Sequence, residues 1–282
     1  MRHTVCPLAL ALACGATDPN GTPGPNPATA LDPGVPPITT GRWDRPSLSV
    51  TWQWQINGPV NTAYDVDLYD VDLFDVSDSV IATLHQAGRT VLCYFSAGSG
   101  ENWRADFNRI PAGALGKPLD GWPGERWLDI RAPEVFALMQ ERLDRAVARG
   151  CDGVEPDNMD ASENDSGFDL TAADQLAFNR NLANEAHRRD LTVALRNAGT
   201  RASDLVDYFD LELNEECHAF NECDVLSVFP ARTKPVLNVE YVPDAAAAQT
   251  LATTVCPRAA TEGFRTLILP LDLDDRFRLA CP

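Results

Sequence analysis

Three acidic residues stand close together near the middle of the chain, in the segment Gly150–Asp160. Asp152, Glu155 and Asp157 lie within six residues of one another, in a run that begins like a buried strand and then opens into the polar loop 161–167. Barrel enzymes present catalytic groups at the carboxyl ends of their strands, where the loops begin. Since side chains alternate along a strand, Glu155 and Asp157 share a face and can both look into a barrel. The alternative is that these acids only cap the next helix; we favour chemistry, because other expected strand ends also carry acids.

Apolar periodicity predicts strands that alternate with helices along the chain. The expected strands cover residues 51–56, part of 64–75, 89–95, 153–157, 191–197, 208–213, 235–241 and 266–272. The expected helices cover 77–87, 133–149, a segment capped by Thr171 that runs to about Arg189, a short segment from Ser203, and 244–254. This order predicts an α/β fold, a (β/α)8 TIM-like barrel in a single domain. A doubly wound open sheet is the competing fold, but the chain has no G-x-G-x-x-G after a first strand, no Walker loop and no G-x-S-x-G elbow.

A barrel would bring the strand ends together on one face. The residues expected there are Asp72, Glu101, Asp157, Asn158, Arg196, Asn197, Glu215, Glu240 and Asp272, with the aromatic residues Trp54, Tyr94 and Tyr241 nearby in sequence. Aromatic rings stack on sugar faces, and two carboxylates can act as acid, base or nucleophile, so this set predicts a carbohydrate cleft. One acid must stay protonated near neutral pH, and crowding with other carboxylates raises a pKa in that way. We expect Asp65, Asp67 and Asp70, in contrast, to face solvent.

Clustered acids could instead hold magnesium or calcium. The loop Asp160–Asp165 loosely resembles a calcium loop, but its spacing is wrong for an EF-hand. No C-x-x-C pair or His-rich cluster indicates zinc. We therefore expect no metal and no cofactor. His85 and His187 fall on expected helices, where packing or surface roles are the simpler interpretation.

Composition and charge restrict the class of protein. The 282 residues are 44% hydrophobic and 23% charged, which is ordinary for a globular protein with one large core. The net charge of −18 argues against nucleic acid as a partner. It favours either a solvated acidic surface or a cationic ligand. We expect the protein to act as a monomer.

The N-terminus resembles a targeting segment. After Arg2 and His3 comes the apolar run Leu8–Ala13, which is too short to span a bilayer. Small residues precede Cys14, as in a bacterial lipoprotein signal, where Cys14 would be lipidated and would tether the protein to a membrane. Cleavage by an ordinary signal peptidase near Ala13 or Ala16 is one alternative, and a disordered cytoplasmic tail is another.

Residues 15–40 are rich in Pro, Gly, Asn and Thr and show no apolar periodicity, which predicts a solvated linker. The expected organisation is therefore a signal segment over 1–14, a linker over 15–40 and the barrel domain over 41–282. A signal followed by a linker predicts an exported bacterial protein, extracellular or at the cell surface.

Six cysteines lie outside the signal region, and an even number in an exported protein predicts disulfides. Cys217 and Cys223 are close enough to close a short loop. Cys256 and Cys281 could tie the last helix to the C-terminus. Cys93 and Cys151 fall in neighbouring expected strands and could pair or remain buried thiols.

Several motifs resemble glycoside hydrolase family 114, the endo-α-1,4-polygalactosaminidases. They are Trp52–Gln55, Asp72–Asp75, Cys93–Ser99, Trp127–Ile130, Gly150–Asn158, Asn214–Cys217 together with Cys223, and Val239–Tyr241. The similarity covers Trp52 to Cys281 and implies a TIM-like barrel that cleaves inside α-1,4-linked galactosamine polymers. Because such polymers are partly deacetylated and cationic, an acidic cleft would attract them.

The resemblance also implies roles for single residues. Asp157 and Glu215 match the family's catalytic pair, with Asp157 as nucleophile or base and Glu215 as general acid. The residues expected to bind substrate are Asp72, Tyr94, Glu155, Asn158, Arg196, Asn197, Glu240 and Tyr241. The chain differs from the family at Arg196, where lysine is frequent, and at His218, where an aromatic residue is common; both differences bear on substrate preference.

Two other functions remain open at this stage. One is a catalytically inactive, surface-tethered polysaccharide-binding barrel, against which the presence of both Asp157 and Glu215 argues. The other is a glycosidase of different linkage specificity, since a fold and two carboxylates do not determine the sugar.

Overall fold

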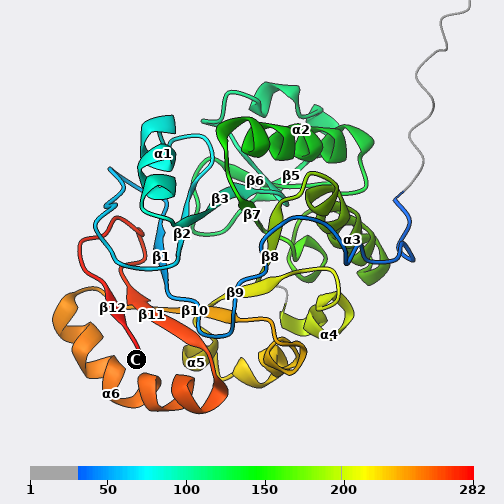
Figure 1. The fold of residues 1–282 in the computed structure, drawn as a ribbon. Helices are drawn as coiled ribbons and strands as arrows, with labels where there is room; N and C mark the ends of the chain where they lie inside the picture. The colour runs from blue at the N-terminus through cyan, green and yellow to red at the C-terminus, as the bar shows by residue number, and fades with distance from the viewer. Residues whose placement is uncertain (1–30, 198) are drawn as a thin grey trace, which may run out of the picture.

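The computed structural model describes residues 31–197 and 199–282. Eight parallel strands form a ring with helices outside it (Figure 1). Their order is β1 (Trp52–Gln55), β2 (Leu68–Asp72), β3 (Thr90–Ser96), β7 (Gly153–Asp157), β8 (Thr192–Arg196), β9 (Leu211–Glu215), β10 (Val236–Tyr241) and β11 (Arg265–Leu269). The short strand β12 (Leu279–Ala280) runs antiparallel beside β11. Trp52 Nε1 donates to the carbonyl of Arg265, and Arg265 Nε donates to that of Val50, which joins the two ends of the sheet. The predicted TIM-like barrel is confirmed.

Helices lie outside the ring of strands. They are α1 (Asp78–Gln86), α2 (Pro133–Arg149), α3 (Ala172–Arg188), α4 (Ala202–Leu205), α5 (Cys217–Phe220) and α6 (Ala245–Glu262). Two of them, α2 and α3, have clear sequence signals at their ends. α2 begins with proline and ends at Gly150, whose φ of 81° suits glycine. Thr171 and Asp174 form a capping box at the start of α3.

Short 3-10 helices complete the connections. They cover Phe107–Arg109, Ala112–Ala114, Ala161–Glu163, Gly199–Arg201, Cys223–Val228 and Pro230–Arg232.

Three elements differ from their predicted bounds by three residues or more. β11 ends at Leu269, three residues before the predicted end at Asp272. α6 continues beyond the predicted end at residue 254 and passes through Pro257, because the buried residues Val255 and Ala259 keep it packed on the barrel. β9 begins three residues later than predicted and includes Glu215, because Tyr208 and Phe209 pack in the outer core before the strand starts.

A small antiparallel sheet, which we did not predict, covers the end of β3. It consists of β4 (Ser99–Glu101), β5 (Leu115–Pro118) and β6 (Glu125–Leu128), in the order β4-β6-β5. The segment lies between β3 and α2 and contributes a wall above the barrel.

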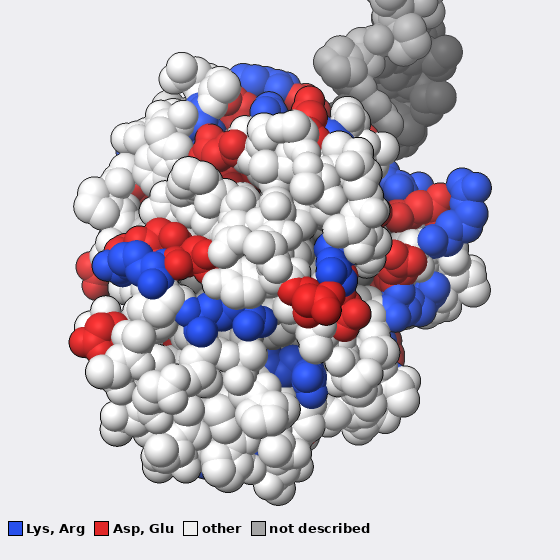
Figure 2. All heavy atoms as spheres, turned by 60° about the vertical axis from the view of Figure 1, so that its left-hand side comes forward, with Lys and Arg blue, Asp and Glu red and all other residues white. Residues whose placement is uncertain are grey.

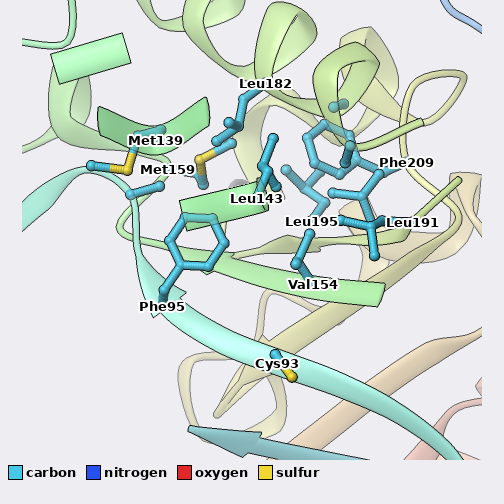
Figure 3. Packing of buried hydrophobic residues seen from close by; sticks show 14 of the residues in the cluster. Cys93, Phe95, Met139, Leu143, Val154, Met159, Leu182, Leu191, Leu195 and Phe209 are labelled. Atoms are coloured by element: carbon cyan, nitrogen blue, oxygen red, sulfur yellow. The ribbon is translucent and has the colours of Figure 1, made fainter. Parts of the chain in front are cut away.

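Two apolar cores hold the barrel together. The larger one lies between the strands and the helices, where Phe95, Val154 and Leu195 of the strands meet Leu143 of α2 and Leu182 of α3 (Figure 3). The smaller core lies inside the ring and includes Trp52, Trp54, Leu68, Leu213 and Val239. Since neighbours in a strand alternate, strands such as β2, β3 and β8 place one set of side chains in each core.

Residues 31–40 pack against the domain, where we expected the last part of a free linker. Asn184 of α3 accepts from Ile38 N and donates to the Pro36 carbonyl, both at 2.9 Å. Leu31 and Val35 contact the outer core. A stretch without periodicity can still dock through single apolar residues and its backbone groups, which explains the difference. The expected signal segment, Cys14 and residues 15–30 of the expected linker lie outside the described residues.

Among the described residues, six cysteines form three disulfides: Cys217–Cys223, Cys256–Cys281 and Cys93–Cys151. The first two are the pairs that the sequence suggested, and the third settles the open choice for Cys93. Within the described residues, none of the helices combines the length and the apolarity needed to cross a bilayer.

Candidate active site

The guanidinium of Arg196 holds both predicted catalytic carboxylates. Its Nε lies 3.0 Å from Asp157 Oδ1, and its Nη2 lies 2.9 Å from Glu215 Oε2. Its Nη1 donates to Glu155 Oε1 at 2.7 Å. The cluster lies at the bottom of a cleft of about 1290 Å³ in the mouth of the barrel.

Strand ends position this cluster. Asp157, Arg196, Glu215 and Tyr241 are the last residues of β7, β8, β9 and β10, which are consecutive in the sheet. The residues two positions earlier in β9 and β10 belong to the inner core. The alternation of side chains therefore turns the last residues inward as well.

Asp157 is held from three sides. Besides Arg196, Tyr94 OH donates to its Oδ2 at 3.3 Å and Asn158 N donates to its Oδ1 at 2.6 Å. Asn158 has a φ of 59°, and a Cβ at Gly98 would lie 1.8 Å from the Asn158 carbonyl oxygen, so this turn requires a glycine opposite it. Burial raises the pKa of Asp157, with a further rise from the charge of Glu215, and Arg196 opposes both.

Glu215 is surrounded by donors. Arg196, Asn197 Nδ2 and Tyr241 OH all donate to its carboxylate, and Asn197 Oδ1 accepts from Glu215 N at 3.1 Å. Burial alone would raise the pKa of Glu215, but Arg196 and the hydrogen bonds from Tyr241 and Asn197 outweigh it, so the pKa is lowered. The pKa values of the two carboxyl groups are therefore shifted in opposite directions, upward at Asp157 and downward at Glu215.

Asp72 lies in the cleft but is already paired. Arg104 Nη2 lies 2.5 Å from Asp72 Oδ2 and 2.9 Å from Glu101 Oε1, and Arg104 Nη1 lies 3.0 Å from Asp75 Oδ2. The expected strand-end residue Asp272 lines the cleft as well. Asp72 therefore shapes one wall through Arg104.

Two predicted substrate-binding residues do not reach the cleft. Glu240 points to the outer side of β10, where it accepts from His218 N at 3.0 Å and Asn238 Nδ2 at 3.1 Å. The prediction for Glu240 was wrong because its neighbour Tyr241 takes the inward position, and alternation sends Glu240 outward. Glu155 points inward but lies fully buried inside the barrel, bound to Arg196, and does not line the cleft.

Two more residues lie inside the barrel against expectation. Asp70, predicted in solvent, is fully buried, and neither carboxylate oxygen has a hydrogen-bond partner. Burial raises the pKa of Asp70 to about 8. Trp54, predicted near the cleft, is buried with its ring 4.7 Å from the guanidinium of Arg196.

The cleft is strongly acidic. Thirteen acidic and three basic side chains line it, and the acidic ones are Asp72, Asp75, Glu101, Asp120, Glu125, Asp157, Asp160, Glu163, Asp165, Glu215, Glu216, Glu222 and Asp272. Burial raises the pKa of Glu125 to about 7 and that of Asp160 to about 6. On the face shown in Figure 2, in contrast, Lys and Arg lie beside Asp and Glu without a large patch of one sign. The excess of acids in the cleft suits a cationic ligand.

Exposed aromatic rings that we did not predict also line the cleft. Trp103, Trp122 and Phe220 are half to two-thirds exposed. The signal available in the sequence was the run of tryptophans between β3 and α2, which we treated as a connection without assigning a site.

Metal ligands are sparse among the described residues. Cys217, His218 and Cys223 are the one group of His, Cys or acids close enough together to hold an ion. Their two sulfurs form a disulfide, so no thiolate is available to bind a metal there.

Known proteins are similar to this chain in fold and, to different degrees, in sequence. The structure of Aspergillus fumigatus Ega3 in complex with galactosamine is 40% identical, with a TM-score of 0.80, and the match covers 86% of this chain and 99% of that one. The glycoside hydrolase domain of PelA from Pseudomonas aeruginosa, 17% identical, has the same fold with a TM-score of 0.63 over 81% of this chain and 96% of that one. An uncharacterised protein of Deinococcus radiodurans is 28% identical over 207 residues, which are 67% of this chain but only 66% of that relative. The profile of glycoside-hydrolase family GH114 matches residues 34–282. The chain therefore belongs to glycoside-hydrolase family GH114 and is a glycoside hydrolase.

Proposed function

We propose that this protein is an endo-acting glycoside hydrolase that cleaves α-1,4-linked galactosamine-containing polysaccharide with Asp157 and Glu215. The observation that carries the proposal is the attachment of both carboxylates to one guanidinium at the bottom of a cleft with thirteen acidic side chains. The similarity to Ega3, whose structure contains galactosamine, supports the choice of sugar. The cationic amines of the polymer would be attracted by the acids of the cleft.

The spacing of the two carboxylates supports a retaining mechanism. Asp157 Oδ1 lies 3.0 Å and Glu215 Oε2 lies 3.2 Å from the same atom, Arg196 Nε, so these oxygens are at most 6.2 Å apart. Retaining enzymes place their carboxyl groups about 5–5.5 Å apart, and inverting enzymes about 6.5–9.5 Å apart. We therefore expect a covalent glycosyl-enzyme intermediate and a product with the anomeric configuration of the substrate.

The roles follow the family resemblance: Asp157 attacks the anomeric carbon, and Glu215 protonates the leaving oxygen and then activates water. A general acid must carry a proton, but Arg196, Asn197 and Tyr241 donate to Glu215 and lower its pKa in the absence of substrate. The leaving-group oxygen must then displace at least one of these donors before Glu215 can carry the proton.

Azide distinguishes the roles. With an activated substrate, azide should rescue Glu215→Ala and give a glycosyl azide of retained configuration. It should rescue Asp157→Ala with inverted configuration. The opposite pattern would exchange the two roles.

Product release from partly deacetylated α-1,4-galactosamine polymer tests the function. The intact enzyme should release short oligosaccharides, and Asp157→Asn and Glu215→Gln should abolish release although both variants stay folded at the assay temperature. Asp152→Asn is the matched control, because Asp152 belongs to the same motif but pairs with His85 away from the cleft.

Cleavage of a different polymer by the same pair would keep the hydrolase and change the substrate. Binding of the galactosamine polymer without cleavage of any polymer would support a polysaccharide-binding barrel.

We also infer that the protein is exported. The three disulfides suit an oxidising compartment. Lipidation of Cys14 would provide a membrane tether, and Cys14→Ser should then move the protein from the membrane fraction to the soluble fraction. Light scattering of the purified protein tests the expected monomer.

A further inference from the structure

We propose that Trp103, Trp122 and Phe220 are sugar-stacking residues that form two amino-sugar subsites, one on each side of the catalytic pair. This inference rests on the proposed function and adds the residues that hold the chain of sugars in place.

The exposed apolar side chains of the protein gather in the cleft. Among residues 31–197 and 199–282, seven large apolar side chains are exposed, and five of them line the cleft: Trp103, Trp122, Phe220, Val225 and Leu271. Only Leu48 and Val147 lie elsewhere. Exposed apolar side chains that are scattered over a surface are normal, whereas a group of them at one polar site indicates that a ligand binds there.

One subsite is built on the small sheet above β3. Trp122 lies in the turn between β5 and β6, which closes through bonds from Trp122 N to the Leu119 carbonyl and from Glu125 N to the Trp122 carbonyl. Trp103 follows β4 and packs on Gly124 of the same turn, where an added Cβ would lie 3.0 Å from its ring. Gly124 has a φ of 100°, which only glycine adopts easily. The two tryptophans are thus fixed on one wall of the cleft.

The other subsite lies at the end of β9. Phe220 is the last residue of α5, and Phe220 N donates to the Glu216 carbonyl at 2.9 Å. The Cys217–Cys223 disulfide closes this loop, so the exposed ring projects from a rigid base. Only β7 and β8 separate β3 from β9 in the sheet, and their ends carry Asp157 and Arg196. The two aromatic surfaces therefore flank the catalytic residues.

Acidic side chains accompany each ring. Asp120 lines the cleft two residues before Trp122, and Glu216 and Glu222 line it on either side of Phe220 in sequence. An amino sugar has an apolar face and an ammonium group, and a ring beside a carboxylate matches both. An N-acetylated sugar would keep the stacking and lose the ion pair, so these subsites select deacetylated units.

Binding by a catalytically silent enzyme tests the proposal. In the Asp157→Asn background, Trp122→Ala and Phe220→Ala should each weaken binding of an α-1,4-galactosamine hexamer by about tenfold in calorimetry. Leu48→Ala and Val147→Ala are the matched controls, because both residues are exposed outside the cleft, and they should leave affinity unchanged. Gly124→Ala, which displaces Trp103, should weaken binding as Trp122→Ala does.

Kinetics with the active enzyme separate a stacking role from a structural one. The aromatic variants should raise KM for the polymer about tenfold and change kcat less than twofold, with unchanged thermal midpoints. The N-acetylated hexamer should bind the silent enzyme more weakly than the deacetylated one.

The outcomes distinguish this inference from the proposed function. If the aromatic variants lose hexamer binding but the intact enzyme does not cleave the polymer, the proposed subsites would be supported and the proposed hydrolysis would be wrong. Cleavage with unaltered affinity and KM in all aromatic variants would overturn the subsites and keep the function. Absence of hexamer binding in the silent enzyme would overturn the subsites as well.

Discussion

Replacing Arg196 by glutamine should destabilise the protein by about 3–5 kcal/mol at neutral pH, the usual cost of removing one partner from a buried ion pair. The side chain of Arg196 is 8% exposed and contacts Glu155, Asp157 and Glu215, whose side chains are 0%, 12% and 20% exposed. Glutamine would leave these carboxylates without a counter-charge. These carboxylates would then have to bind protons as the protein folds. At any pH above the pKa of the group in the unfolded chain, the binding of each such proton lowers the stability of the fold.

Arg196 also determines how the stability changes with pH. Arg196 lowers the pKa of Glu215, so in the natural protein this pair adds stability above about pH 4.3, the unfolded pKa of glutamate, and the gain is lost as pH falls through the folded pKa. The glutamine variant lacks that gain. Its deficit should therefore be largest at neutral pH and shrink towards acid pH.

Urea unfolding of both proteins at several pH values, with disulfides intact, measures this deficit. Arg232→Gln is the control, because the Arg232–Asp207 pair is about half exposed and its loss should cost less than about 1 kcal/mol. A deficit equal to that of the control, or one that stays constant between pH 4 and pH 7, would refute the reasoning about Arg196.

Three further predictions concern other parts of the barrel. Asp70→Asn should become more stable relative to the natural protein as pH rises from about 4, the unfolded pKa of Asp70, to about 8, its folded pKa, because buried Asp70 must bind a proton when the protein folds. A difference in the free energy of unfolding that does not change with pH would contradict this. Removal of the Cys93–Cys151 link, which spans 58 residues, should destabilise the protein by about 4 kcal/mol through chain entropy, and removal of Cys217–Cys223, which spans 6, should destabilise it by about 2 kcal/mol. The serine double variant of Cys93 and Cys151 should therefore unfold at a lower urea concentration than that of Cys217 and Cys223. Gly98→Ala should lower both kcat and the thermal midpoint, since its Cβ would lie 1.8 Å from the Asn158 carbonyl oxygen and would push that turn, and with it Asp157, out of place; unchanged kcat in the folded variant would show that the turn adapts.

The sequence predicted best the elements whose ends carry strong local signals. α2 and β7 have the predicted bounds, because proline begins α2, Gly150 ends it, and a continuous apolar stripe lies between. The capping box of Thr171 marks the start of α3 in the same way. One position of the α2 stripe, Val147, is 47% exposed, because it lies at the edge of the buried face.

For individual residues in the strands, the side of the sheet to which each side chain points was harder to predict. Asp65 and Asp67 precede β2, which begins at Leu68, and the alternation of the strand starts only there. Asp70 falls on the inward side of β2 with Leu68 and Asp72, although its acidic neighbours earlier in the sequence lie outside the strand. A shift of one residue in the assumed start of a strand reverses every such assignment.

The charges inside the barrel link the fold to its proposed substrate. Asp70, Glu155, Asp157 and Glu215 are opposed by the single guanidinium of Arg196, since Arg104 is taken up by Asp72, Asp75 and Glu101. Buried carboxylates in excess of cations must bind protons or accept another positive charge. Burial raises the pKa of Asp70 to about 8 and also raises the pKa of Asp157, so both shifts favour the binding of a proton. An amine of the substrate would supply a second cation next to Arg196, lower these pKa values and release protons, whereas a neutral sugar would not. Binding of the cationic hexamer to the Glu215→Gln variant, which keeps Asp70 and Asp157, should therefore release protons at pH 7. Calorimetry in buffers of different ionisation enthalpy would detect the release, and binding without proton exchange would contradict this account of the buried charge.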